Sequence, residues 1–165
     1  MPTAPIAEQR PATHLENHLR ADLFIPEIKN KRKAAVLEEL VGHLADRGIT
    51  RFPEPVLEVL RQREALGSTG VGKGIAIPHA RSTLVAERAV LVARSKKGIE
   101  FESLDEHPVH LCFLIVAPPS ENDPVYLQLL AEIVKVVRLS RVRQKLLDAP
   151  DFHAVRSIIS GQLHE

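Results

Sequence analysis

The chain has 165 residues, a length that suits one domain with a single buried core. Its formal net charge of +1 gives no indication of a nucleic acid or a membrane surface as a partner. The single cysteine excludes an internal disulfide. No apolar run is as long as the roughly 20 residues that cross a bilayer, and none forms the core of a signal peptide. We therefore expect a cytoplasmic protein without membrane insertion.

The first half of the chain is predicted to be helical after a tail. Residues 1–17 are polar and proline-containing without a clear period, which predicts a flexible N-terminal tail before one domain at 18–165. Apolar residues recur at helical spacing over 31–47, and Gly48 follows where a C-terminal cap belongs. A second helix is predicted from Pro53–Pro55 to just before Gly67.

The pattern then changes to short apolar runs rich in β-branched residues. Residues 75–77, 89–93 and 109–116 are predicted strands covered on both faces, and 101–104 indicates a short strand or a turn. An amphipathic helix is predicted over 124–139, followed by a short helix capped by Ser140 and a last one capped by Asp151. This order predicts a mixed α/β fold, a three-layer α-β-α sandwich with a small mixed β-sheet covered by helices on both faces.

The glycine-rich segment 67–81, GSTGVGKGIAIPHAR, has two interpretations. Gly67, Gly72 and Lys73 match the opening of a Walker A nucleotide loop. However, Gly74 occupies the position of the hydroxyl that holds magnesium, and here a helix precedes the loop and a strand follows it, which is the reverse of the order in a nucleotide loop. We therefore expect no nucleotide site.

The second interpretation is a phosphorylated histidine. Pro78 favours an extended residue before it, so that a strand leads to His79, whose neutral ring has a nucleophilic nitrogen near neutral pH. The hydroxyls of Ser68 and Thr69, the loop amides and Arg63 one helical turn upstream are candidate ligands for a phosphoryl group. An isolated histidine would be read as an ordinary surface residue, but the whole string favours a site.

These residues resemble the signature of a known family. Arg63-Glu64, LGSTG at 66–70, GIAIPH at 74–79 and FESLD at 101–105 are similar to the type-2 EIIA domains, the mannitol- and fructose-class phosphocarriers of the bacterial sugar phosphotransferase system, which include nitrogen-regulatory EIIA proteins. The resemblance covers about residues 23–159. It implies that His79 takes phosphate from HPr or a relative and passes it to an EIIB partner, with Arg63, Ser68, Thr69 and Gly70 around the phosphate and no metal or organic cofactor.

One position departs from the family pattern. Members carry a second histidine, in an H-L-x-x-L context, where this chain has Tyr126. A phenol donates a hydrogen bond but is no cation at neutral pH, so Tyr126 is either a phosphate-binding residue or an aromatic that packs on the core. Two features favour an alternative function: the tyrosine at position 126, and the lack of an EIIB or membrane segment in the chain. The alternative is a regulatory binding module with weak or no onward phosphotransfer.

Three further predictions concern the surroundings of the site. Partners that dock over His79 are expected to meet an apolar rim at Val71, Ile75 and Leu84. His110 is predicted to be a satisfied sheet residue and Cys112 a small core residue. The basic stretch at 138–145 is interpreted as a solvated helix face without a nucleic acid partner.

Overall fold

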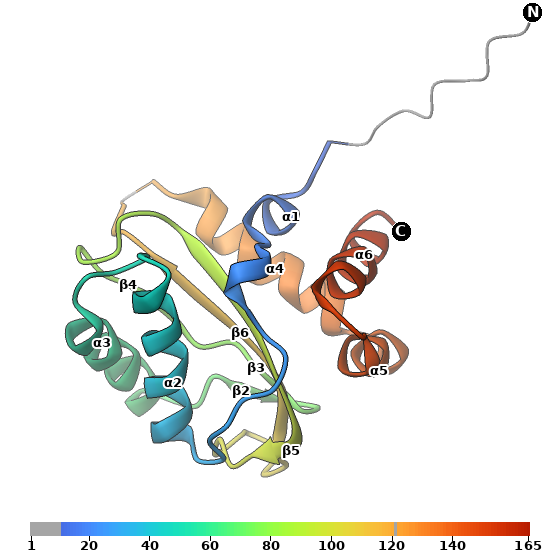
Figure 1. Cartoon of the computed structure of the whole chain (residues 1–165), viewed down its shortest axis with the longest axis horizontal. Coiled ribbons are helices and arrows are strands. Elements are labelled where there is room, and N and C mark those ends of the chain that lie inside the picture. Colours follow the sequence, from blue (N-terminus) through green and yellow to red (C-terminus); the bar gives the residue numbers. More distant parts are fainter. Residues whose placement is uncertain (1–10, 121) are drawn as a thin grey trace, which may run out of the picture.

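The computed structural model describes residues 11–120 and 122–165, which form six α-helices and a six-stranded sheet (Figure 1). The helices are α1 His14–His18, α2 Lys33–Asp46, α3 Pro53–Ala65, α4 Pro124–Val137, α5 Ser140–Asp148 and α6 Phe152–Leu163, with a single 3₁₀ turn at Ala21–Leu23. The strands are β1 Phe24–Ile25, β2 Gly70–Gly72, β3 Ile75–Ala76, β4 His79–Arg81, β5 Ala89–Ile99 and β6 Val109–Ala117. Among the described residues, no helix combines the length and the apolar character needed to cross a membrane.

The sheet is built around the antiparallel pair β5 and β6, whose register runs from Ala89 opposite Val116 to Ile99 opposite Val109. Strand β1 lies parallel on the other side of β5. Strands β3 and β4 follow each other along β6, both parallel to it, and β2 pairs antiparallel with β3. The sheet is therefore mixed, as expected.

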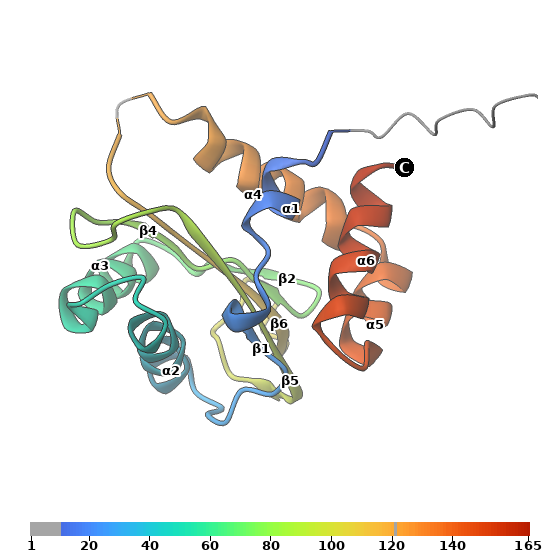
Figure 2. The same ribbon diagram turned by 45° about the horizontal axis from the view of Figure 1, so that its top comes forward.

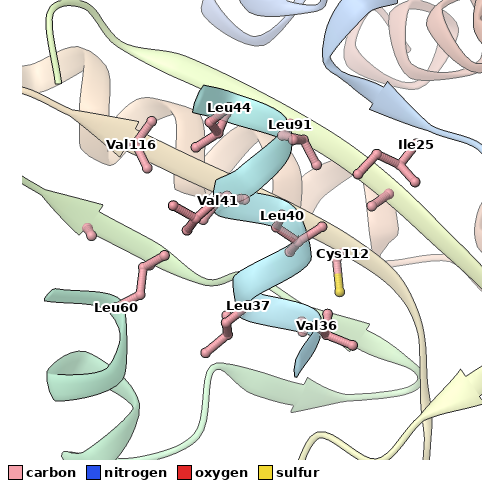
Figure 3. Packing of buried hydrophobic residues seen from close by; sticks show 14 of the residues in the cluster. Ile25, Val36, Leu37, Leu40, Val41, Leu44, Leu60, Leu91, Cys112 and Val116 are labelled. Atoms are coloured by element: carbon pink, nitrogen blue, oxygen red, sulfur yellow. The ribbon is translucent and has the colours of Figure 1, made fainter. Parts of the chain in front are cut away.

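Helices cover both faces of this sheet (Figure 2). Along β6, side chains alternate between two cores because successive residues of a strand point to opposite faces. Cys112, Leu114 and Val116 belong to the core under α2 and α3, where Figure 3 shows Leu40 of α2 beside Cys112. The residues between them, Leu111, Phe113 and Ile115, belong to the core under α1, α4, α5 and α6. The predicted three-layer arrangement and the two-sided burial of the strands are confirmed.

Two of the three predicted helix caps agree with the structure. Gly48 has a φ of +76°, the left-handed conformation that a glycine after a helix adopts readily. The Asp151 carboxylate accepts a hydrogen bond from the backbone N–H of Ala154 at 2.8 Å. The prediction for Ser140 is wrong: it is the first residue of α5, and Leu139 precedes the helix without a side-chain cap. Asp123, in the loop before α4, accepts from the N–H of Val125 and caps that helix instead.

The N-terminal boundary also differs from the predicted tail at 1–17, of which residues 1–10 lie outside the described part. Thr13 and Glu16 form a reciprocal capping box that starts α1. Leu15 of this helix is fully buried, and its backbone N–H donates to the carboxylate of Glu132 in α4 at 2.6 Å. A helix of one turn is too short to show a period in the sequence, which explains why residues 13–17 were assigned to a tail.

Candidate functional site

His79 opens β4, directly after the break in the strand at Pro78. Its ring Nδ1 lies 2.8 Å from the carbonyl oxygen of Ile77. Because a carbonyl oxygen can only accept a hydrogen bond, Nδ1 carries the ring hydrogen and Nε2 keeps its lone pair. The side chain is half-buried, and the contact with Ile77 orients the imidazole so that Nε2 is the ring nitrogen left to act as a nucleophile in the neutral ring.

Arg63, near the end of α3, lies beside that nitrogen. Its Nε–H donates toward Nε2 of His79 at 3.4 Å, and its Nη1–H donates to the carbonyl oxygen of Gly67 at 2.9 Å. The bond to Gly67 fixes the guanidinium against the loop. The structure therefore brings a cation to the His79 ring, and the roles of Arg63 and His79 in binding a phosphoryl group stay predictions.

Ser68 and Thr69 are turned into the loop and the scaffold. The Ser68 hydroxyl accepts from the N–H of Gly70 at 3.0 Å and donates to the carbonyl oxygen of Phe101 at 3.4 Å. Thr69 is buried, and both its backbone N–H and its hydroxyl donate to the carboxylate of Glu64. In the described part of the chain, these groups form hydrogen bonds with the loop, with Phe101 and with Glu64 rather than with His79. Phosphate binding by Ser68, Thr69 and the Gly70 amide therefore stays a prediction.

The carboxylate that anchors this loop is held by a buried ion pair. Glu64 of α3 pairs with the ammonium of Lys33 at the start of α2, and its side chain is only 7% exposed. The Lys33 ammonium also lies over the ring of Phe101, 4.9 Å from the centroid. The sequence contains Glu64 next to Arg63 as a motif letter, but nothing in it joins Lys33 to this site.

The tip of the loop forms a β-hairpin. Lys73 has a φ of +57° between the positive φ values of Gly72 and Gly74, and its N–H donates to the Asp105 carboxylate at 2.9 Å. Strands β2 and β3 pair on either side of this turn. A nucleotide loop joins a strand to a helix, so the observed hairpin agrees with the expectation that this is no Walker A site.

Tyr126 lies in the first turn of α4 and meets His79 edge-on, with 6.2 Å between the ring centroids. Its side chain is 6% exposed and belongs to the core under α4. Burial raises the pKa of the Tyr126 phenol to about 12, while the charges of Arg81 and Arg63 act in the opposite direction. Tyr126 is therefore both a core aromatic and a direct neighbour of His79, and it is neutral near pH 7.

The predicted apolar rim is only partly present. Val71 is 52% exposed, but Ile75 is 2% exposed because β3 places it in the core beside β6, so that prediction was wrong. Leu84 is half-buried against the other core. Two large exposed residues, Leu66 after α3 and Leu127 beside Tyr126, were not predicted to belong to the rim, although each directly adjoins a site element in the sequence.

His110 and Cys112 have the structural roles predicted for them. Ring Nδ1 of His110 lies 2.8 Å from the carbonyl oxygen of Ser95 across the sheet, a satisfied sheet contact. Cys112 is fully buried, and burial raises the pKa of its thiol to about 12, so it stays protonated at neutral pH. Neither residue contributes to the chemistry at His79.

Comparisons with known proteins agree with the motif. A family model described as "Phosphoenolpyruvate-dependent sugar phosphotransferase system, EIIA 2" matches residues 17–162. The chain is 36% identical over 133 residues to a fructose-specific EIIABC component of Bacillus subtilis, covering 81% of this chain and 21% of that one, so it spans about a fifth of the length of this relative. It is also 36% identical over 140 residues to a nitrogen regulatory protein of Bradyrhizobium diazoefficiens, covering 84% of this chain and 90% of that one.

Solved structures share the fold. The nitrogen regulatory protein IIA-Ntr from Neisseria meningitidis superposes with a TM-score of 0.80 at 28% identity, covering 87% of this chain and 97% of that one. A complex of IIA mannitol with phosphorylated IIB mannitol from Escherichia coli contains a chain with a TM-score of 0.73 at 20% identity, over 87% of this chain and 97% of that one. On the family match, this chain belongs to the EIIA type-2 family of the phosphoenolpyruvate-dependent sugar phosphotransferase system.

Proposed function

We propose that this chain is a phosphoryl carrier of the phosphotransferase system with His79 as the residue that is phosphorylated. The observation that carries the proposal is the contact between Nδ1 of His79 and the Ile77 carbonyl oxygen, which leaves Nε2 unprotonated beside Arg63. Family membership supports it, and the single domain at 18–165, with α1 packed onto it, is the unit that acts.

The donor is a phosphohistidine on an HPr-like protein. The Nε2 lone pair attacks phosphorus, the N–P bond of the donor breaks, and the donor ring nitrogen keeps that electron pair. The Arg63 Nε–H, which points to Nε2 in the free protein, then donates to a phosphoryl oxygen. Most of the catalytic effect is positioning and charge stabilisation, as is general for phosphoryl transfer.

Onward transfer reverses this chemistry. A cysteine thiolate or a histidine of an EIIB partner attacks the phosphorus, and Nε2 leaves with its electron pair, ready for another cycle. The exposed apolar side chains of Val71, Leu66 and Leu127 are available to contact such partners. The solved complex of IIA mannitol with phosphorylated IIB mannitol supports an EIIB as the kind of partner.

The second candidate is a regulatory module of the nitrogen-regulatory type, in which phosphorylation of His79 controls docking onto another protein. The likeness to nitrogen regulatory proteins supports it, since the match covers most of the length of both chains. The two candidates share the phosphorylation step and differ in the acceptor.

Intact-mass measurement after incubation with phosphoenolpyruvate and the general phosphotransferase enzymes tests both candidates. We expect a mass gain of one phosphoryl group that is lost in His79→Ala and kept in His107→Ala, which changes an exposed histidine. Absence of labelling, while an authentic EIIA is labelled, would refute the proposal, and labelling that survives His79→Ala would refute the assignment of His79. Transfer to a sugar-class EIIB would identify a transport role, and labelling without such an acceptor would identify a regulatory one.

A further inference from the structure

Arg81 shares a strand face with His79 because the two residues are two positions apart in β4. Its guanidinium carbon lies 4.1 Å from the centroid of the Tyr126 ring, and the same ring meets the imidazole of His79 edge-on. One aromatic side chain therefore contacts both the nucleophile and a second arginine. This stack is a favourable cation–π contact in a water-poor setting, which fixes the plane of the guanidinium.

The guanidinium of Arg81 is incompletely paired. Its Nη1–H donates to the carbonyl oxygen of Ser120 at 3.2 Å. Its Nε is buried and has no hydrogen-bond partner in the described part of the chain, and no carboxylate there forms an ion pair with Arg81. A buried N–H without an acceptor is rare, and it is often explained by a ligand or ion that supplies one.

The charged side chains around His79 also lack partners of opposite charge. Arg63 and Arg81 are both cationic, while Tyr126 is neutral near pH 7 because burial raises the pKa of its phenol. Glu64, next to Arg63, is turned toward Thr69 and paired with Lys33, and Asp123, three positions before Tyr126, is paired with Arg88. A phosphoryl group carries about −1.5 to −2 charges and three acceptor oxygens, which matches two arginines without acidic partners.

We propose that Arg81 is a second phosphoryl-binding residue of this chain, held in position by the Tyr126 ring and donating through its buried Nε–H to the phosphoryl group on His79. The inference rests on the proposed function for the covalent step. It also gives Tyr126 a defined part: the ring is a platform that holds the guanidinium of Arg81.

The first experiment measures single-turnover phosphorylation of His79 by a phosphorylated HPr-type donor. Loss of a hydrogen bond to a charged group lowers a rate by about 10- to 100-fold, so Arg81→Gln is expected to fall by this factor. Arg81→Lys keeps the charge without the planar fork and is expected to fall less. The matched control is Arg141→Gln, which removes the same charge from an exposed site on α5. Unchanged rates in Arg81→Gln would overturn the proposal.

The second experiment uses the unmodified protein and does not depend on phosphotransfer or on the folding of a variant. Inorganic phosphate is titrated against the assigned arginine Nε–H signals in proton–nitrogen NMR spectra. We expect the signals of Arg63 and Arg81 to shift together and that of Arg141 to stay. Movement of Arg63 alone would overturn the proposal. Movement of both in a protein that no phosphotransferase donor labels would instead refute the proposed function and retain the anion site.

Variants at Tyr126 separate the ring from the hydroxyl. Tyr126→Phe keeps the platform and is expected to be phosphorylated faster than Tyr126→Ala, which removes it. Tyr126→His is expected to add little to the wild-type protein but to restore part of the rate lost in Arg81→Gln, because it brings back a side chain that can become a cation. If Tyr126→Phe is phosphorylated slowly while Arg81→Gln is phosphorylated at the wild-type rate, the Tyr126 hydroxyl and not Arg81 binds the phosphoryl group, and the proposal is overturned.

Discussion

Tyr126 offers a direct test of how dry the site beside His79 is. It is the only tyrosine and the chain has no tryptophan, so the ultraviolet absorbance of phenolate follows this one side chain. Burial raises its pKa from 10.0 to about 12. A rise of two units corresponds to about 3 kcal/mol, because each unit is 1.36 kcal/mol of differential interaction. The folded state holds this proton more tightly than the unfolded state, so the stability involved is complete below about pH 10 and is lost between about pH 10 and 12.

The assay is an alkaline absorbance titration of the native protein and of the protein in denaturant. We expect a midpoint near 12 in the native protein and near 10 after unfolding. In denaturant unfolding, the stability of Tyr126→Phe relative to wild type should rise by up to about 3 kcal/mol between pH 7 and pH 12. The thiol of Cys112, whose pKa is also raised to about 12, is present in both proteins and cancels in the comparison. A native midpoint near 10 would refute the burial of the phenol and with it the water-poor platform for Arg81.

Three further predictions concern stability and are checked by denaturant unfolding. Gly70→Ala is expected to cost about 1–3 kcal/mol, because the added Cβ would collide with the Ser103 hydroxyl and lie 3.0 Å from its Cα. Gly42→Ala, inside α2 with no atom near the new Cβ, is expected to stabilise by about 0.5–1 kcal/mol, and a loss there would contradict the helix assignment. Glu64→Gln is expected to cost up to about 3–5 kcal/mol by leaving the mostly buried ammonium of Lys33 without its ion-pair partner. Glu38→Gln breaks the exposed ion pair with Arg61 and should cost less than about 1 kcal/mol. Equal losses of stability in Glu64→Gln and Glu38→Gln would refute the difference expected between the two ion pairs.

The fold was predictable where local pattern and burial agree. Strand β6 reads as a continuous apolar run because its two faces lie in two cores, and a sequence shows such a run directly. Strands β2 and β4 have three residues each and form because β3 and β6 supply their hydrogen-bonding partners. Segments this short show no alternation of apolar and polar residues that would predict a strand. Ser140 illustrates a second limit: a serine near a helix start was taken as a cap, whereas the preceding residue occupies the cap position.

The sequence predicts only those candidate site residues that lie within one recognisable motif. His79 and Arg63 stand sixteen positions apart in a recognisable string, and α3 and β4 bring them together. The partners that give them their properties lie outside it. Lys33 comes from α2 and Tyr126 from α4, and both meet the loop only through tertiary packing. Arg81 is the last residue of the glycine-rich segment, but its contact with the Tyr126 ring and its unpaired Nε are visible only in the structure.

The contact between His79 and the Ile77 carbonyl oxygen separates the control of the nucleophile from the control of charge at this site. A backbone acceptor survives any side-chain replacement, so the tautomer of His79 is fixed by the strand itself. What changes the chemistry is the set of cations that meet the phosphoryl group. A cation that binds the phosphorylated histidine and the transition state equally well favours the phosphorylated carrier without speeding onward transfer, whereas one that binds the transition state better speeds it. If Arg81→Gln slows loading and release alike, Arg81 acts in the transition state and suits a carrier; if it slows loading but accelerates release, Arg81 holds the phosphoryl group and suits a regulatory switch.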